Sequence, residues 1–372
     1  MKLLKFIERK SAEFPQKLYL SKIKYAEEKA IRDKKAIYAN IKWSGKQQKE
    51  FDDFWIKNYG KKIKPWWNKL YERFNGVYHY DYFPEMLYTT KLEPILNSFE
   101  DCKAIENKAL IEFIYGQVEN VRIPKTYLAC CNGVYRNSDR SIVSFDEAKK
   151  TLSDIGECVI KPTVETGSGK GVRFLNIKNG KDITKNEAIG DILKNYKKDF
   201  IVQEAIKSSK EFMKLYPHAV NTIRLTSYIA DGRVGFCPIA LRIGANGSKL
   251  DNIHSGGIGV RIYHDGKLDA KGYQLGYGNK SVTYSAHPDT GTVFKDFYAC
   301  DIQKVMSVAR DLHSITPNVG IISWDFTIDE NDNVVLIEAN CRDQGVWFPQ
   351  IVCESSLFGD DTAYMLNLIR EK

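Results

Sequence analysis

Three side chains near the C-terminal end have the types and spacing of a divalent-cation site. Asp325 is followed thirteen residues later by Glu338, and Asn340 lies two residues beyond. Residues 329–333 between them are turn formers flanked by apolar segments, which predicts a β-hairpin. If residues 330–333 form a four-residue loop, Asp325 lies directly across from Glu338, and alternation along the strands puts all three side chains on one face. Two carboxylates and an amide oxygen are hard ligands of the kind that Mg²⁺ takes beside nucleotide phosphates.

Length and composition describe a globular protein with more than one lobe. The chain has 372 residues, of which 43% are hydrophobic and 27% are charged. No apolar run approaches the ~20 residues needed to span a bilayer, and the charged N-terminus does not resemble a signal peptide. The eight cysteines form no CxxC pair and no zinc spacing. We therefore expect free thiols and a cytoplasmic location.

The positive charge is concentrated at the N-terminal end. Residues 1–50 contain 14 Lys/Arg and 6 Asp/Glu, a surplus of +8 that equals the net charge of the whole chain. This basic arm has two interpretations. It can contact an anionic surface, such as the inner membrane face, an acidic polysaccharide or a lipid-linked phosphate, or it can be a solvated helical face rich in lysine. Nucleic acid is not expected, because no recognition motif accompanies the charge.

Periodicity and turn residues give a coarse map of the chain. Apolar spacing predicts a helix over residues 16–42, and residues 45–100 are rich in aromatic side chains that either stack on sugars and bases or fill a core. After residue 155, strands and turns dominate. Further helices are predicted at 186–196, 208–216, 296–313 and 360–370.

A lysine and a glycine-rich turn follow one another in the middle of the chain. The short apolar strand 158–162 carries Lys161 near its end, and residues 165–171 then read Glu-Thr-Gly-Ser-Gly-Lys-Gly. Glycines let backbone amides approach phosphate oxygens and let a loop close as a lid. The run matches neither the P-loop nor the dinucleotide fingerprint, so by itself it is a weak signal and a plain hairpin turn is the simpler interpretation. Residues 200–206 form another strand, ending in Gln203-Glu204-Ala205-Ile206, which can offer backbone groups to an adenine edge and a carboxylate to a ribose.

Taken in order, these elements resemble the ATP-grasp superfamily. A strand lysine, a glycine-rich hairpin, a strand ending in Gln-Glu and a distal Asp…Glu-x-Asn hairpin occur in that sequence, and Lys108 provides the earlier lysine that the family expects. Segments 82–88, 218–226, 240–244 and 252–257 narrow the resemblance to the sugar-transfer-associated ATP-grasp branch, linked to exopolysaccharide, capsule and lipopolysaccharide biosynthesis. The resemblance covers roughly residues 50–372.

The resemblance implies an α+β ATP-grasp fold in which two α/β lobes clasp ATP, preceded by a helical N-terminal extension and a substrate-side lobe. The expected division is a basic helical arm at 1–50, a substrate-side lobe at 51–125, a nucleotide lobe with the glycine-rich lid at 126–206, and a catalytic lobe with the metal-binding hairpin at 207–372.

The resemblance also assigns roles to residues. Asp325, Glu338 and Asn340 would hold one or two Mg²⁺ ions at the terminal phosphates of ATP, and Lys108 and Lys161 would contact the α- and β-phosphates. The expected lid over the phosphates comprises Thr166, Gly167, Ser168, Gly169, Lys170 and Gly171. The expected adenine segment comprises Gln203, Glu204, Ala205 and Ile206, with Glu204 the best candidate for a side-chain contact.

Arginines and one histidine are the candidates for the reacting groups. Arg224 fits the γ-phosphate or an acyl-phosphate, because a planar guanidinium matches phosphoryl geometry, and Arg242 and Arg342 suit the same phosphate or an acceptor carboxylate. His254 suits a base or a phosphate donor. The alternatives are surface ion pairs for the arginines and a packed turn residue for His254. The segment 221–224 reads Asn-Thr-Ile-Arg where many ligases of the superfamily carry an acidic residue, so substrates of peptide or D-alanine ligases do not transfer.

The predicted function is an ATP-dependent carboxylate–amine ligase that acts through an acyl-phosphate. The expected carboxylate is a uronic-acid-type sugar, and the expected amine is an amino acid or amino alcohol, in surface polysaccharide biosynthesis. Two alternatives stay open, namely a sugar kinase built on the same site and a nucleotide-binding accessory subunit of a glycosyltransferase system.

Overall fold

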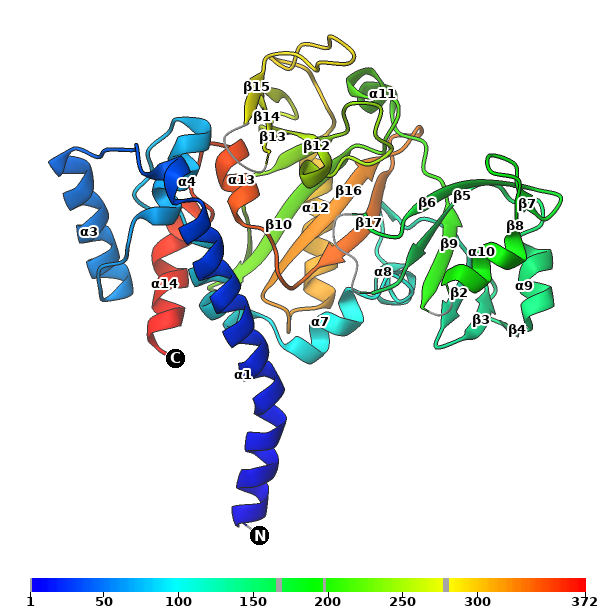
Figure 1. Cartoon of the computed structure of the whole chain (residues 1–372), viewed down its shortest axis with the longest axis horizontal. Coiled ribbons are helices and arrows are strands. Elements are labelled where there is room, and N and C mark those ends of the chain that lie inside the picture. Colours follow the sequence, from blue (N-terminus) through cyan, green and yellow to red (C-terminus); the bar gives the residue numbers. More distant parts are fainter. Residues whose placement is uncertain (1, 165–168, 197–198, 277–280) are drawn as a thin grey trace.

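The computed structural model describes residues 2–164, 169–196, 199–276 and 281–372, with only the backbone course for residues 2–15. Two β-sheets dominate the molecule, and they lie side by side with the helical N-terminal region beyond the larger one (Figure 1). The mixture of sheets and flanking helices is the α+β class predicted from the sequence.

The larger sheet, at the centre of Figure 1, carries the predicted metal hairpin. Its strand order is β1-β17-β16-β10-β12-β13-β14-β15, with β11 paired to β10. Helix α12 packs on the face that Trp324 and Phe326 fill, which leaves the opposite face to the polar residues of the same strand. The strands are β1 (Val121–Arg122), β10 (Thr222–Ala230), β11 (Arg233–Phe236), β12 (Ala240–Ile243), β13 (Ile258–Ile262), β14 (Leu268–Gln274), β15 (Val282–Tyr284), β16 (Ile321–Ile328) and β17 (Val334–Asn340).

The smaller sheet forms a separate lobe, at the right of Figure 1, with its own apolar core beneath α9 and α10. Its strand order is β4-β3-β2-β9-β5-β6-β7-β8. The strands are β2 (Thr126–Cys131), β3 (Val134–Asn137), β4 (Ile142–Val143), β5 (Gly156–Pro162), β6 (Arg173–Lys178), β7 (Lys181–Asp182), β8 (Glu187–Ala188) and β9 (Phe200–Glu204).

The predicted helices exist, with shifted ends. The largest shift is in the N-terminal helix, predicted over residues 16–42, because α1 already begins at Lys2 and ends at Asp33. Helix α12 begins six residues later than predicted, at Ile302, because the Asp301 side chain caps it by accepting hydrogen bonds from the Gln303 and Lys304 amides. The helices are α1 (Lys2–Asp33), α2 (Lys35–Tyr38), α3 (Gly45–Tyr59), α4 (Trp66–Asn75), α5 (Glu85–Leu87), the π-helical turn η1 (Tyr88–Leu92), α6 (Glu93–Leu96), α7 (Phe99–Ile105), α8 (Ile111–Tyr115), α9 (Phe145–Thr151), α10 (Ile189–Tyr196), α11 (Lys210–Leu215), the 3-10 turn η2 (Ile253–Ser255), α12 (Ile302–Ile315), α13 (Trp347–Val352), η3 (Gly359–Asp361) and α14 (Thr362–Arg370).

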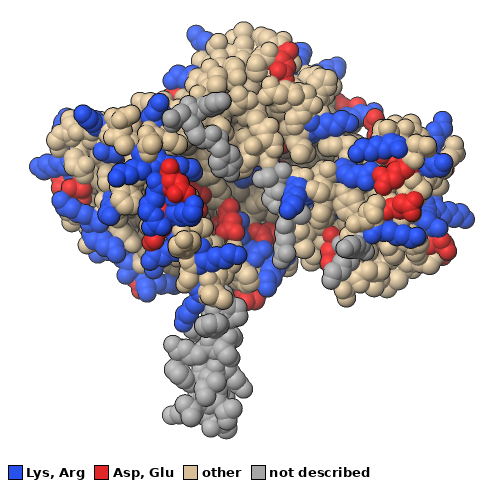
Figure 2. Space-filling view, in the orientation of Figure 1, with Lys and Arg blue, Asp and Glu red and all other residues tan. Residues whose placement is uncertain are grey.

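The basic N-terminal segment is helical, but its second half is not a free arm. Helix α1 projects from the body toward the N-terminus, whereas Ile31 and Tyr38 are buried in a cluster with Trp67 and Tyr71 of α4. The aromatic region 45–100 therefore supplies core as well as surface. Lysine and arginine side chains are spread over the helical region and the small lobe, rather than confined to α1 (Figure 2).

Two further expectations concern cysteines and membrane spans. All eight cysteines are free thiols, as predicted, and Cys131 alone is exposed. Within the described part of the chain, no helix has the length and apolar character needed to cross a bilayer.

Candidate active site

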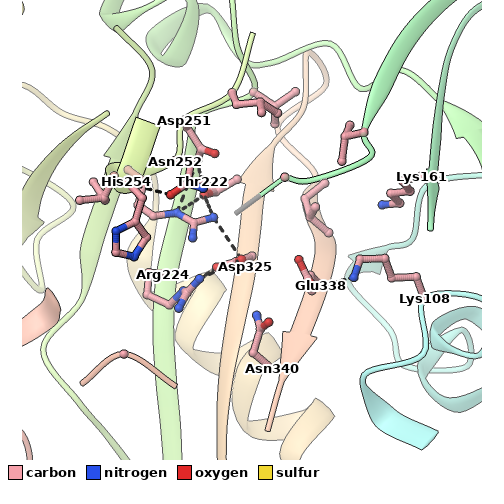
Figure 3. Close-up of a pocket in the computed structure, with 18 of the residues that line it drawn as sticks. Lys108, Lys161, Thr222, Arg224, Asp251, Asn252, His254, Asp325, Glu338 and Asn340 are labelled. Carbon is pink, nitrogen blue, oxygen red and sulfur yellow. Dashed lines mark hydrogen bonds and ion pairs between the residues drawn. The ribbon is translucent and has the colours of Figure 1, made fainter. Parts of the chain in front are cut away.

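A cavity of about 470 Å³, here called the main cavity, opens between the two sheets (Figure 3). It brings together thirteen of the predicted residues from six separate parts of the chain. They are Lys108, Lys161, Gly169, Gln203, Glu204, Ile206, Arg224, Arg242, His254, Asp325, Glu338, Asn340 and Arg342.

A cross-strand row on the larger sheet builds the centre of the cavity. Arg224 of β10 lies directly opposite Asp325 of β16, which in turn lies opposite Glu338 of β17. The predicted pairing of Asp325 with Glu338 is confirmed, although the loop length and the strand register that produce it differ from the prediction. The loop has five residues, because Ile328 pairs with Val334, and a bulge at Ile337 restores the register. Asn340, two residues beyond Glu338, lines the same cavity.

Asp325 is buried between two arginines. Its Oδ1 accepts a hydrogen bond from Arg224 Nε at 2.6 Å, and its Oδ2 accepts from Arg224 Nη2 and Arg242 Nη2, both at 3.1 Å. Burial alone would raise the pKa of Asp325, but the two guanidinium groups outweigh it and hold that pKa below its ordinary value. The carboxylate is therefore ionised at neutral pH.

Arg242 is held by residues that the sequence analysis did not single out. Its Nε and Nη2 donate to Thr222 Oγ1 at 2.9 and 2.7 Å, and the Thr222 hydroxyl donates to the Asp251 carboxylate. Thr222 lies directly opposite Arg242 in the sheet, two residues before Arg224 on β10. Because alternate side chains of a strand share one face, the position of Thr222 two residues before Arg224 could have indicated it from the sequence. Nothing in the sequence, by contrast, connects Asp251 with Arg242.

Two lysines face this row from the side of the smaller sheet (Figure 3). Lys108 Nζ donates to Glu338 Oε1 at 2.6 Å, and the Lys108 amide donates to Thr163 O at 3.0 Å, which fixes its segment beside the end of β5. Lys161 on β5 lines the same wall. Burial, together with the neighbouring Lys108 charge, lowers the pKa of Lys161 to about 8. Both ammonium groups are thus placed where an anionic ligand would compensate them.

The predicted lid lies partly outside the described residues, which exclude Thr166, Gly167 and Ser168. Gly169 has φ +70 and lines the cavity, and an added Cβ there would lie 2.8 Å from Leu250 Cδ1 of the larger-sheet lobe. Glycine is therefore required both by the backbone conformation and by the close approach to Leu250. Lys170 and Gly171 are exposed and do not line the cavity.

The predicted adenine segment lies at the other end of the cavity. Gln203, Glu204 and Ile206 line it, whereas Ala205 faces a separate polar pocket nearby. The Glu204 carboxylate accepts from Arg122 Nη2 and from the Lys125 amide, both at 2.6 Å. The predicted contact of Glu204 with a nucleotide thus involves a side chain already oriented by two donors.

Arg342 has a well-defined partner that the sequence did not indicate. Its Nε and Nη2 donate to Glu106 Oε2 at 2.8 and 2.5 Å, and the guanidinium lies over the Phe99 ring. Glu106 also accepts from the Cys341 and Arg342 amides, at 3.0 and 2.8 Å. In this structure Arg342 therefore anchors the segment after the metal hairpin, and no contact joins it to Asp325.

Buried glutamates hold the rest of that segment. Glu93 accepts from the Asp343 and Gln344 amides, and Glu85 accepts from the Trp347 amide at 2.9 Å. Burial raises the pKa of Glu93 to about 8 and that of Glu85 well above its ordinary value. The N-terminal region thereby fixes the loop that follows β17 on the cavity wall.

His254 lies at the far edge of the cavity, on the turn η2. Its ring centroid is 5.6 Å from that of Trp347. Partial desolvation and the nearby Lys34 lower its pKa, so the imidazole is neutral at pH 7. Position and protonation state are compatible with the predicted role as a base.

The donor set fits Mg²⁺ that shares its coordination with a phosphorylated ligand. Asp325, Glu338 and the Asn340 amide offer hard oxygens, and Asn340 Nδ2 donates to Ser323 O at 3.3 Å, which leaves its Oδ1 for the cavity. Among the described residues no group of three or more His, Cys, Asp or Glu forms a complete cage. Mg²⁺ characteristically binds through one or two carboxylates plus substrate phosphates, so a cage is not required.

Comparison with known proteins identifies the family. The model of the sugar-transfer associated ATP-grasp family matches residues 87–364, three quarters of the chain, so this protein belongs to that family and has the ATP-grasp fold. The recognition made from the motifs is thus confirmed. A search of curated proteins found no match.

The solved structures that resemble this chain are distant. D-alanyl-alanine synthetase A from Vibrio cholerae is 12% identical with a TM-score of 0.41, over 72% of this chain and 66% of that one. Biotin carboxylase from Campylobacter jejuni is 12% identical with a TM-score of 0.42, over 75% and 49%. N5-carboxyaminoimidazole synthetase from Staphylococcus aureus, complexed with ADP, is 12% identical with a TM-score of 0.36, over 64% and 45%. The matched part spans about half the length of the first such structures.

Proposed function

We propose that this protein is an ATP-dependent carboxylate–amine ligase that amidates a uronic-acid-type sugar carboxylate during surface polysaccharide biosynthesis. The observation that carries the proposal is the distribution of charge in the main cavity. Lys108 and Lys161 stand on one side of the hairpin carboxylates, and Arg224 and Arg242 stand on the other. The lysines suit the phosphates of ATP as point charges, and the two guanidinium groups provide a separate anion site that suits a carboxylate.

The reaction then follows from positions within the cavity. An oxygen of the acceptor carboxylate, oriented by Arg224 and Arg242, attacks the γ-phosphorus of ATP, and ADP leaves. An amine then attacks the acyl carbon, phosphate leaves, and the neutral His254 takes the proton that the amine loses. Bound Mg²⁺, held by Asp325, Glu338 and Asn340, would neutralise charge on the terminal phosphates.

The ion pairs within the site are arranged for exchange. Each carboxylate that would hold the metal already pairs with a cation that would hold a phosphate or carboxylate, since Glu338 pairs with Lys108 and Asp325 with Arg224 and Arg242. Binding of the magnesium complex of ATP would replace these pairs with contacts to the metal and to the phosphates, so the charges of the site would stay compensated.

Product analysis tests the proposal. The protein is incubated with ATP, Mg²⁺, UDP-glucuronate, UDP-galacturonate and a pool of amino acids, and nucleotide, free phosphate and product masses are read together. A ligase yields ADP, phosphate and an amide. A phosphorylated sugar without free phosphate would show a kinase instead, and the absence of any substrate-dependent turnover would favour an accessory subunit. Glu338→Gln should abolish turnover, whereas Glu330→Gln in the exposed hairpin loop should not.

A further inference from the structure

A second cavity, here called the side cavity, adjoins the main one. It has a volume of about 190 Å³ and lies between the N-terminal helices and α13. Glu85, His254 and Trp347 line both cavities, so the two share a wall at the edge where the acyl-phosphate would form. Cavities of about 150 Å³ accommodate a benzene ring, so the side cavity is large enough for a small organic molecule.

The side cavity differs from the main one in chemistry. Most of its wall is aromatic or aliphatic, with Trp67, Tyr71 and Phe74 on one side. Its charged members are Glu27, Lys34 and Glu85, so acidic groups outnumber basic ones. The main cavity, by contrast, presents lysines and arginines to anionic ligands. A cation with an apolar body is the ligand that this lining complements.

Two polar groups in the side cavity lack partners. The Glu27 carboxylate has no hydrogen bond or close ion pair to any described residue, and the fully buried Tyr71 hydroxyl has no hydrogen-bond partner there either. The charges of Glu27 and Glu85 both raise the pKa of Tyr71, and the charge of Glu27 raises the pKa of Glu85. The polar ends of these three side chains therefore lie near one another. Buried polar groups are ordinarily satisfied, and an ammonium ion, with three N–H donors, would satisfy the buried Tyr71 hydroxyl oxygen and pair with the partly buried Glu27 carboxylate.

We propose that the side cavity binds the amine nucleophile, and that this nucleophile is an amino acid with an apolar side chain. Its ammonium group contacts Glu27 and Glu85, its carboxylate contacts Lys34, and its side chain packs on the aromatic wall. The proposal rests on the ligase function proposed above, for which it names the second substrate class.

The electrostatics support this assignment. Burial raises the pKa of both Glu27 and Glu85, and for Glu27 it outweighs the nearby Lys34 charge, so a cationic ligand beside the two carboxylates would stabilise their ionised forms. Lys34 lines the side cavity together with Glu27 and His254, and it is close enough to lower the pKa of both. His254, on that wall, stands where the amine must lose a proton before it attacks.

Binding measurements on the full chain test the proposal without knowledge of the acyl donor. The protein, saturated with the magnesium complex of AMPPNP, is titrated by calorimetry with each of the twenty standard amino acids and with 2-phenylethylamine and 3-methylbutylamine. Apolar amino acids should bind. Glu27→Gln should weaken their binding at least about tenfold, because a charged hydrogen bond is lost. The matched control Glu28→Gln, on the outer face of α1, should leave affinity unchanged.

Lys34 supplies the second half of the test. Lys34→Met should weaken binding of L-phenylalanine and L-leucine but not of the corresponding amines, which lack the carboxylate, whereas Lys35→Met should change neither. The proposal is overturned if no amino acid binds, if Glu27→Gln and Glu28→Gln behave alike, or if Glu27→Gln instead weakens binding of UDP-glucuronate. If the magnesium complex of AMPPNP itself fails to bind, the ligase function fails, whereas normal nucleotide binding without amino-acid binding overturns the amine site alone.

Discussion

The replacement of Asp325 by asparagine should destabilise the free protein as well as abolish turnover. Asp325 is 3% exposed and accepts three hydrogen bonds from Arg224 and Arg242. Breaking a buried ion pair by removing one partner costs about 3–5 kcal/mol. We expect the lower end, about 3 kcal/mol, because the two arginine side chains keep 18% and 17% exposure to the cavity and Arg242 retains Asp251.

Glu338 provides the contrast. Its side chain is 26% exposed and its one ion pair within the described part of the chain is with Lys108, so Glu338→Gln should cost about 1 kcal/mol or less. Both variants should lose turnover, since both remove a proposed metal ligand. Glu338→Gln therefore tests the loss of turnover with little change in stability, whereas Asp325→Asn measures how much the ion pairs with Arg224 and Arg242 stabilise the fold.

Urea unfolding followed by tryptophan fluorescence measures the difference, since buried Trp324 adjoins Asp325 on β16. The pKa of Asp325 is lowered in the folded protein, so its contribution is complete above the unfolded value of about 3.9 and disappears as pH falls through the folded value. The gap between wild type and Asp325→Asn should accordingly close in strong acid. Equal unfolding midpoints at pH 7, or an equal shift in Glu338→Gln, would refute the reasoning.

Three further predictions follow from the same structure. Lys161→Met should lower affinity for the magnesium complex of ATP at least about tenfold. Because the pKa of Lys161 is about 8, the affinity of the wild type should fall as pH rises through that value, whereas the affinity of the variant should not change with pH. A wild-type affinity that is independent of pH in calorimetry would contradict this prediction. Glu106→Gln should lower kcat/KM with less effect on ATP affinity, since Arg342 and two amides lose their acceptor; steady-state kinetics that match wild type would remove the anchoring role. Deletion of residues 2–15 should spare ATP turnover and weaken co-sedimentation with vesicles of anionic lipid, whereas equal sedimentation would leave the segment as a solvated helix.

Much of the hairpin that carries the proposed metal ligands could be predicted from its sequence. Turn residues and strand alternation located Asp325, Glu338 and Asn340 on one face, because both signals are local. The loop length was nevertheless wrong by one residue, and the bulge at Ile337 compensated for it. A bulge depends on how the strand packs in the whole sheet, so the hairpin alone did not reveal it.

The partners of the arginines could not be predicted. Arg342, a candidate for the reacting groups, lines the main cavity, but its ion-pair partner is Glu106, 236 residues earlier. Arg224 and Arg242 both contact Asp325, which lies 101 and 83 residues away from them. Ion pairs over such separations depend on strand order, and strand order is a property of the folded sheet rather than of any segment.

The sequence by itself determined the family, because lysines, a glycine-rich turn and an Asp…Glu-x-Asn hairpin can each be recognised in a short stretch of chain. Only the tertiary structure decided which charges face one another, that Glu85, Glu93 and Glu106 hold the loop after β17, and that a second cavity with acidic and aromatic walls adjoins the first. The physical reason is that helices and loops far apart in the chain line the side cavity. Its volume and the charge of its wall depend on how those segments pack together.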